Sequence, residues 1–109
     1  MDKQLKRGML DVCVLAALIG GDSYGYKIIK DLQPHIEISE STLYPILRRL
    51  EEQGALTVYS VEHNGRLRKY YKITDGGKDK IKIFLDEWET MMDIFSFIKD
   101  EMKGEAADK

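Results

Sequence analysis

The feature that most constrains the fold is one hairpin signal, the dipeptide Asn64-Gly65, which lies between two segments suited to β-strands. Residues 56–61 and 66–73 are rich in β-branched and aromatic side chains, and an Asn-Gly pair between such segments favours a two-residue turn. That turn sets the register, which gives these facing pairs: His63 and Arg66, Val61 and Arg68, Tyr59 and Tyr70, Val58 and Tyr71, and Leu56 and Ile73. The base of the hairpin would then have one apolar face, and its tip would be cationic.

The rest of the chain has apolar residues at the spacing of helices. The pattern predicts four helices, over residues 3–19, 24–32, 41–53 and 75–103. Gly20-Gly21 ends the first helix, and Asp22 or Ser23 is expected to cap the second. The predicted fold is mainly α with a small antiparallel β-hairpin, of the α+β class. Its expected parts are a winged helix-turn-helix over 1–73, a long C-terminal dimerisation helix over 74–104 and a disordered tail over 105–109.

The helix expected over 41–53 has one face for a core and another for solvent. Its apolar residues fall at i, i+3, i+4 and i+7: Leu43, Ile46, Leu47 and Leu50. Ser39 or Ser41 can cap its start, and Pro45 requires that start to lie near Ser41, because proline is tolerated only in the first turn. Gly54 is expected to end the helix in the left-handed conformation.

The solvent face of this helix carries the residues Ser41, Tyr44, Pro45, Arg48 and Arg49. Hydroxyl and guanidinium groups beside a basic hairpin are typical of a helix that reads DNA. The alternative for the two arginines is a salt bridge to Glu51, Glu52 or another surface acid. The sequence therefore predicts a DNA-binding surface and leaves the structural alternative open.

Charge is distributed unevenly along the 109 residues. The formal net charge of −2 does not favour nucleic-acid binding, but basic residues concentrate between 44 and 72 and acidic ones from 86 onward. One cysteine excludes an internal disulfide and suits a reducing compartment. With no signal-peptide pattern and no apolar run of bilayer length, we expect a cytoplasmic protein without a membrane segment.

The sequence does not favour catalysis, a cofactor or a metal site. It contains no Gly-rich phosphate loop and no nucleophile paired with a base. His35 and His63 have no Cys or His partner at the spacing of metal ligands. We therefore expect a protein that is not an enzyme.

Apolar residues of the last predicted helix repeat as a heptad. A helix over 75–103 would be roughly 40 Å long, and no other segment of the chain remains to cover its apolar stripe. We therefore expect a two-fold homodimer. The expected interface consists of Ile81, Phe84, Leu85, Trp88, Met91, Met92, Phe95 and Ile98.

Three segments resemble the PadR-like transcriptional regulators of bacteria, in particular the short subfamily with a single C-terminal helix. They are GDSYGYKIIKDL at 21–32, LYPILRRLEEQG at 43–54 and RKYYKITDGGK at 68–78. The resemblance implies a dimeric winged-helix repressor whose last helix crosses against the first helix of its partner. It places the DNA-facing positions on Ser41, Thr42, Tyr44, Pro45 and Arg48 of the helix, and on Arg66, Arg68, Lys69 and Tyr70 of the wing.

The resemblance also implies an effector site. Members of this family commonly sense small aromatic or multidrug-like compounds, and in one subgroup paired tryptophans on the last helix sandwich a flat ligand. Trp88 matches that position, and Met92, Val12 and Met9 are expected beside it. The alternative is that Trp88 is a core residue of the dimer.

The function expected is that of a ligand-responsive transcriptional regulator, a repressor. It would bind an inverted-repeat operator of double-stranded DNA through a recognition helix at 41–53 and a wing at 59–70. Two alternatives without sequence-specific DNA binding remain open. One is a winged-helix module that binds a protein through its acidic last helix, and the other is a protein that sequesters an apolar ligand at Trp88.

Overall fold

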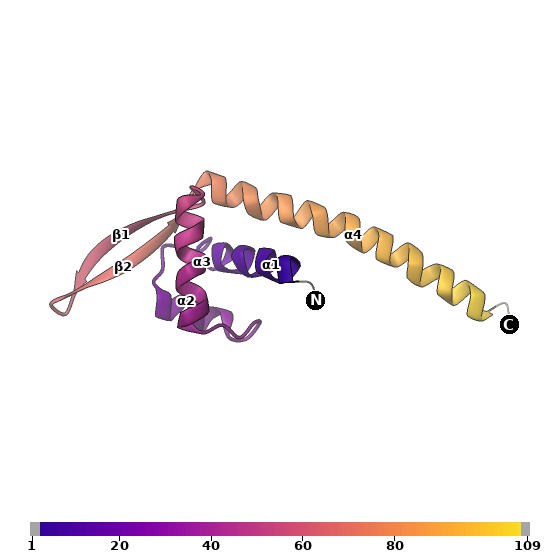
Figure 1. Ribbon diagram of the computed structural model, residues 1–109, viewed down its shortest axis with the longest axis horizontal. Helices are drawn as coiled ribbons and strands as arrows, with labels where there is room; N and C mark the ends of the chain where they lie inside the picture. The colour runs from indigo at the N-terminus through magenta and orange to yellow at the C-terminus, as the bar shows by residue number, and fades with distance from the viewer. Residues whose placement is uncertain (1–2, 108–109) are drawn as a thin grey trace.

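The computed structural model describes the backbone of residues 3–107 and the side chains of residues 6–105. Its elements follow the order α1 (Lys3–Ala16), α2 (Gly25–Leu32), α3 (Glu40–Glu52), β1 (Leu56–His63), β2 (Arg66–Ile73) and α4 (Asp75–Ala107). The first three helices cluster between the hairpin, which projects on one side, and the far part of α4, which extends on the other (Figure 1). The molecule measures 71 × 25 × 24 Å as a result. This mainly helical architecture with one antiparallel hairpin confirms the predicted fold class.

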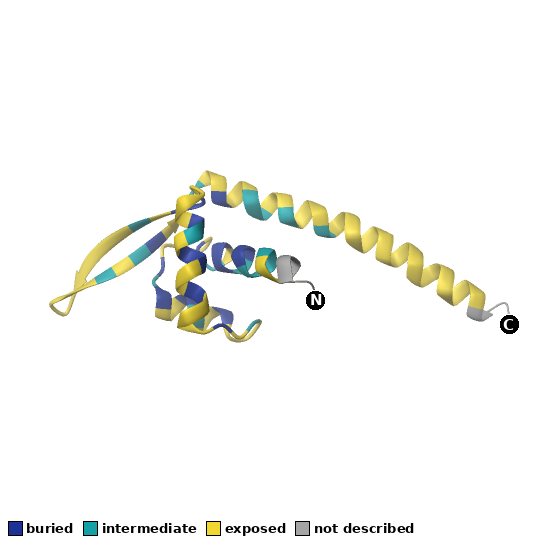
Figure 2. Ribbon diagram, viewed as in Figure 1, coloured by how far each residue is buried: buried dark blue, intermediate teal, exposed yellow. Residues whose placement is uncertain are grey.

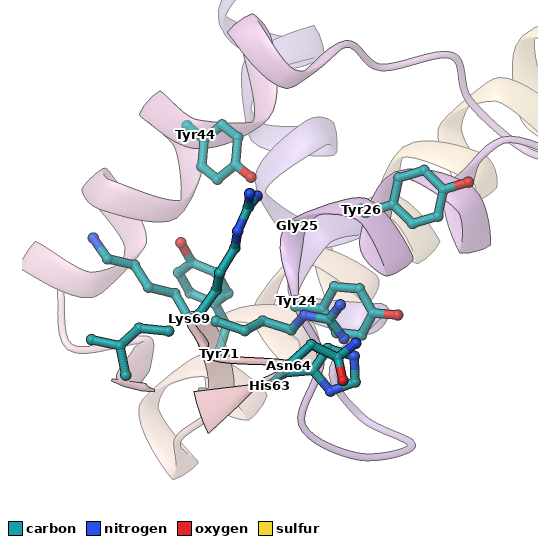
Figure 3. Close-up of a pocket in the computed structure, with 11 residues that line it drawn as sticks. Tyr24, Gly25, Tyr26, Tyr44, His63, Asn64, Lys69 and Tyr71 are labelled. Carbon is teal, nitrogen blue, oxygen red and sulfur yellow. The ribbon is translucent and has the colours of Figure 1, made fainter. Parts of the chain in front are cut away.

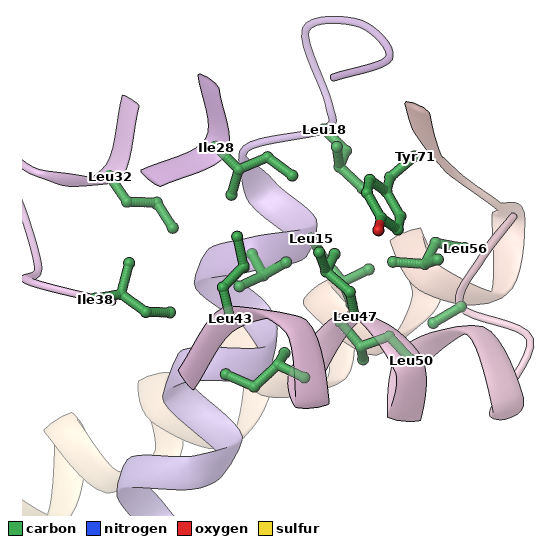
Figure 4. Packing of buried hydrophobic residues seen from close by; sticks show 13 residues of the cluster. Leu15, Leu18, Ile28, Leu32, Ile38, Leu43, Leu47, Leu50, Leu56 and Tyr71 are labelled. Atoms are coloured by element: carbon green, nitrogen blue, oxygen red, sulfur yellow. The ribbon is translucent and has the colours of Figure 1, made fainter. Parts of the chain in front are cut away.

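The core lies where the three short helices meet the base of the hairpin (Figure 4). All four residues of the apolar stripe on α3 are buried, as the helical spacing predicts: Leu43, Ile46, Leu47 and Leu50. Leu15 of α1, Ile28 of α2 and Leu56 of β1 pack with them. Burial of this apolar surface supplies the main driving force for folding of the domain.

The hairpin has the register that its turn predicts, from Leu56 opposite Ile73 at the base to His63 opposite Arg66 at the tip. Asn64 and Gly65 have φ angles of 52° and 79°, which is the signature of a type I′ turn. Ser23 forms an isolated antiparallel bridge with β2, in which its N–H and C=O pair with the C=O and N–H of Tyr71 at 3.1 and 2.7 Å.

Two helix ends near this bridge differ from the prediction. Helix α1 ends at Ala16, before the predicted end at residue 19, and Ile19 is 53% exposed. Helix α2 begins after Tyr24, whose side chain makes no capping hydrogen bond. The predicted cap by Asp22 or Ser23 is wrong because Ser23 pairs with β2 and the carboxylate of Asp22 accepts a hydrogen bond from Tyr59.

Helix α3 begins one residue earlier than its proline suggests. The hydroxyl of Ser39 caps it by accepting a hydrogen bond from the N–H of Thr42 at 3.3 Å. Pro45 is thus the sixth residue of a helix that starts at Glu40, and the prediction that it lies in the first turn is wrong. Because Pro45 has no N–H, the carbonyl of Ser41 one turn earlier lacks its helical hydrogen bond. Both residues are exposed, so water can bond to that carbonyl.

Helix α4 is anchored at its start and bare over most of its length. The hydroxyl of Thr74 caps it, accepting from the N–H of Gly77 at 3.1 Å, and donates to the carbonyl of Gly54 at 2.6 Å. Gly54 has φ +74°, as its predicted left-handed cap requires. Every residue from 89 to 105 is exposed (Figure 2).

The C-terminal end of α4 also differs from the prediction. The helix continues through Gly104 to Ala107, so the predicted disordered tail is wrong for 105–107, and residues 108–109 lie outside the described residues. One glycine costs a helix only about 1 kcal/mol relative to alanine, and the residues that follow it are good helix formers. Among the described helices, even this one of 33 residues is not apolar enough to cross a membrane.

Candidate nucleic-acid interface

A cleft of about 880 Å³ opens between the hairpin, the start of α2 and the outer side of α3 (Figure 3). Its lining combines aromatic and cationic side chains: Tyr24, Tyr26, Tyr44, Tyr71, Arg66, Arg68 and Lys69. We call it the wing cleft. Concave surfaces with such donors suit a polyanion, because cations neutralise phosphates and hydroxyl groups hydrogen-bond their oxygens.

Tyr44 and Gly25 bring α3 and α2 into close contact at the wing cleft. A Cβ atom on Gly25 would lie 2.5 Å from the Tyr44 hydroxyl oxygen, so only glycine leaves room for this ring. Tyr44 itself is 44% exposed. Gly25 was not among the predicted site residues, although a glycine between two tyrosines at the start of a helix was a visible signal.

The two adjacent arginines of α3 have different surroundings. Arg48 is exposed and, with Lys69, lines a smaller cleft of about 110 Å³ between α3 and β2. Arg49 instead forms an ion pair with Asp11 of α1, whose side chain is only 7% exposed. The structure therefore gives Arg49 an intramolecular ion pair, and its contact with DNA stays a prediction. Its partner is neither of the neighbouring glutamates considered from the sequence.

The outer face of the hairpin carries a group of side chains that we call the tyrosine clasp: Asp22, Tyr24, Tyr59, Arg68 and Tyr70. The Tyr70 ring stacks on that of Tyr59 at 5.7 Å and meets that of Tyr24 edge-on at 5.5 Å between centroids. The Arg68 guanidinium lies 4.2 Å from the centroid of the Tyr24 ring. The Tyr59 hydroxyl donates to Asp22 at 2.6 Å, and this hydrogen bond raises the pKa of Tyr59.

The predicted wing residues are thus divided between two environments. Arg66 and Lys69 are exposed, whereas Arg68 and Tyr70 are half-buried by their contacts within the clasp. Sequence reasoning missed Asp22, Tyr24 and Tyr59, because nothing in the local pattern reveals that Ser23 pairs with β2. Tyr71, which faces Val58 in the predicted register, is buried at 6% exposure. Burial raises its pKa, followed by nearby Tyr44 and Glu51.

The residues expected at the dimer and effector sites are also divided. Ile81, Phe84 and Trp88 of α4 are half-buried, and Phe84 meets Trp88 edge-on at 6.0 Å. Helix α4 runs beside α1 (Figure 1). Val12 is buried and Met9 half-buried on α1. The remaining residues of the predicted interface are exposed: Leu85, Met91, Met92, Phe95 and Ile98. Across the described residues, no group of three or more His, Cys, Asp or Glu side chains is arranged to hold a metal ion.

Three helices followed by a twisted hairpin, with an exposed third helix beside it, define a winged helix-turn-helix protein. Residues 14–83 match the sequence profile of a family described as the transcriptional regulator PadR-like family. The chain therefore belongs to the PadR-like family of transcriptional regulators, and it is not an enzyme.

Solved structures agree with this assignment. A transcriptional regulator from Clostridium thermocellum is 36% identical with a TM-score of 0.77, over 86% of this chain and 96% of that one. A PadR-like transcription factor from Bacteroides fragilis is 32% identical with a TM-score of 0.78, over 87% and 94% of the two chains. PadR of Bacillus subtilis, solved in complex with operator DNA, is 26% identical with a TM-score of 0.64, over 70% of this chain and 46% of that one.

Proposed function

We propose that this transcriptional regulator is a homodimeric repressor that binds an inverted-repeat operator and leaves it when a small effector binds. The observation that carries the proposal is the position of α3, whose exposed face stands beside a wing cleft lined by Arg66, Arg68 and Lys69. The solved complex of Bacillus subtilis PadR with operator DNA supports the same kind of partner for this chain.

The proposed DNA contacts follow from exposure and chemistry. Ser41 and Arg48 lie on the exposed face of α3, where a hydroxyl can bind a phosphate and a guanidinium can bond bidentately to guanine. Arg66 and Lys69 project from the hairpin and would neutralise backbone phosphates. The full proposed set is Ser41, Thr42, Tyr44, Pro45, Arg48, Arg66 and Lys69, and all of these residues are exposed.

The proposed dimer rests on the bare part of α4. Its large apolar side chains are about half exposed or more, for example Met92 at 53%, Phe95 at 54% and Ile98 at 55%. Contiguous apolar surface on this scale marks an interaction site. A second copy would cover it by the two-fold packing usual in dimers and would set the two recognition helices about 34 Å apart, one turn of DNA.

The proposed effector site lies where α4 packs beside α1. Trp88 of α4 is half-buried, and Val12 and Met9 lie on the helix beside it, with Met92 one turn further along α4. A flat aromatic or multidrug-like compound held there would favour one arrangement of the two copies and so change the spacing of the recognition helices. We place this activity in the cytoplasm, the compartment that holds the DNA.

The test is a titration of the DNA upstream of the protein's own coding sequence against a scrambled duplex at two salt concentrations. We expect at least a roughly thousandfold preference for the upstream duplex and a steep loss of affinity with salt. Arg48→Ala should cost about 1–3 kcal/mol of binding free energy if the side chain reads a base. Lys82→Ala, which removes an exposed cation of α4, is the matched control and should change nothing.

Equal and weak binding of both duplexes would contradict autoregulation. The explanations that remain would be an operator elsewhere in the genome, a winged-helix module that binds a protein, or a protein that sequesters a ligand. Effector binding separates those functions further, because an inducer and an operator must weaken one another by the same factor. A compound that binds at Trp88 without changing DNA affinity would support a ligand-sequestering protein.

A further inference from the structure

The tyrosine clasp is built by the period-two alternation of the two hairpin strands and of the extended segment bridged to them. The isolated bridge between Ser23 and Tyr71 sets residues 22–24 beside β2, and Tyr24 has extended backbone angles. Because successive residues of a strand point to opposite faces, Ser23 faces the core with Tyr71, and Asp22 and Tyr24 face outward. Tyr70 lies opposite Tyr59 on that outer face. The two strands and the bridged segment therefore present one row of contacting aromatic rings, Tyr59, Tyr70 and Tyr24, on the surface away from the core.

The clasp lies between the rigid base of the hairpin and its unsupported tip. Val58 and Ile73 at the base pack against the core, whereas residues 59–67 are all exposed and Leu67 near the turn is 78% exposed. A two-stranded hairpin is only marginally stable by itself in water. The direction in which the tip projects must therefore be determined by contacts made beyond the core, and the clasp provides them.

We propose that the tyrosine clasp sets the position of the wing relative to α2 and α3, and that Arg68 is a positioning residue that acts on DNA binding through Tyr24. This inference rests on the proposed binding of DNA. Arg68 and Tyr70 hold β2 against Tyr24, at the N-terminus of α2, while the Tyr59 hydroxyl ties β1 to Asp22. The wing is thereby joined to the helix that packs against α3 and supports it.

The three basic residues of the wing then have distinct tasks. Arg66 and Lys69 are exposed and are available to phosphates. Arg68 is half-buried with its guanidinium over the Tyr24 ring, a geometry in which the ring face attracts the cation. If the Arg68 guanidinium moved away to bind a phosphate, it would lose its attraction to the Tyr24 ring. The wing would then lose one of the contacts that hold it beside α2.

A double-mutant cycle separates positioning from direct contact. The probe is a labelled random-sequence duplex, which reports backbone binding without knowledge of the operator. Arg68→Gln and Tyr24→Leu should each weaken binding roughly two- to fivefold, the range expected for an exposed cation–π contact. The double variant should bind no more weakly than the weaker single one, because both changes break one contact.

Tyr24→Phe separates the ring from the hydroxyl, since it keeps the ring that holds Arg68 and removes only the hydroxyl. We expect its affinity to lie closer to that of the unchanged protein than the affinity of Tyr24→Leu does. A loss of affinity equal to that of Tyr24→Leu would overturn the proposal, because the hydroxyl and not the ring would then matter. Arg68→Gln could also weaken DNA binding by the same factor in the unchanged protein and in Tyr24→Leu. That result would overturn the proposal and would identify Arg68 as a direct phosphate contact.

Amide hydrogen exchange of the free protein tests the clasp without DNA. In Tyr24→Leu we expect faster exchange at residues 60–68 and unchanged exchange in α3, whose core residues the change leaves in place. Unchanged exchange at 60–68 would overturn the proposal. If the unchanged protein bound no duplex at any salt concentration, the proposed function would fail, and the exchange experiment would still decide whether the clasp holds the wing.

Discussion

Gly77→Ala is predicted to weaken the junction at which α4 joins the winged domain. A Cβ atom at position 77 would lie 2.2 Å from the carbonyl oxygen of Ala55 and 2.7 Å from Cγ1 of Ile73. The carbonyl cannot simply turn away, because it accepts a hydrogen bond from the N–H of Thr74 at 3.1 Å. Helix α4 would therefore have to move outward, by roughly 1 Å, to reach an ordinary contact distance.

The magnitude follows from two opposing effects. Overpacking of this kind lowers the free energy of unfolding by about 1–3 kcal/mol. Replacing a helical glycine by alanine raises it by at most about 1 kcal/mol. We expect a net loss of about 1–2 kcal/mol in the free energy of unfolding. For a chain of this size that loss lowers the melting temperature by roughly 5–10 °C.

Gly76→Ala is the control in the same turn of α4. The nearest neighbour of a Cβ atom at position 76 would be the carbonyl oxygen of Gly54 at 3.4 Å, which is an ordinary contact distance. This variant should therefore be as stable as the unchanged protein or slightly more stable. Thermal unfolding followed by far-UV circular dichroism compares the two at equal protein concentration, since the melting temperature of the proposed dimer would depend on that concentration. Equal stability of the two variants would refute the argument that only glycine permits this close approach.

Three further predictions concern the candidate interface. Arg49→Met should lower the free energy of unfolding by about 3 kcal/mol, because it leaves the buried Asp11 carboxylate unpaired; a loss below about 1 kcal/mol in urea unfolding would mean that solvent screens the pair. Gly25→Ala should displace the flexible end of Tyr44 at little cost in stability and should weaken duplex binding; unchanged affinity would remove Tyr44 from the interface. Tyr59 has a raised pKa in the folded protein, so the stabilisation that it provides is complete below about pH 10 and is lost as pH rises through that folded pKa. Above pH 10, the unfolding midpoint should accordingly fall less steeply with rising pH in Tyr59→Phe than in the unchanged protein. Parallel pH profiles of the two proteins would contradict the hydrogen bond to Asp22 as the origin of the raised pKa.

The sequence by itself determined the features that depend on neighbouring residues. Asn64-Gly65 dictated a turn with positive φ angles, and the turn dictated the register of the whole hairpin. The spacing of the apolar residues on α3 identified its buried face, and Gly54 marked the end of that helix. These outcomes follow from local sterics and from periodicity, which a short stretch of chain contains in full.

Only the tertiary structure decided how the polar side chains are used. Arg48 and Arg49 are neighbours with the same chemistry, yet Asp11 lies beside one of them and not the other. Arg68 was predicted to contact DNA, and the structure also places its guanidinium over the ring of Tyr24, which the bridge of Ser23 to β2 brings close. In each case the partner lies far away along the chain, and the approach depends on packing that no local pattern contains.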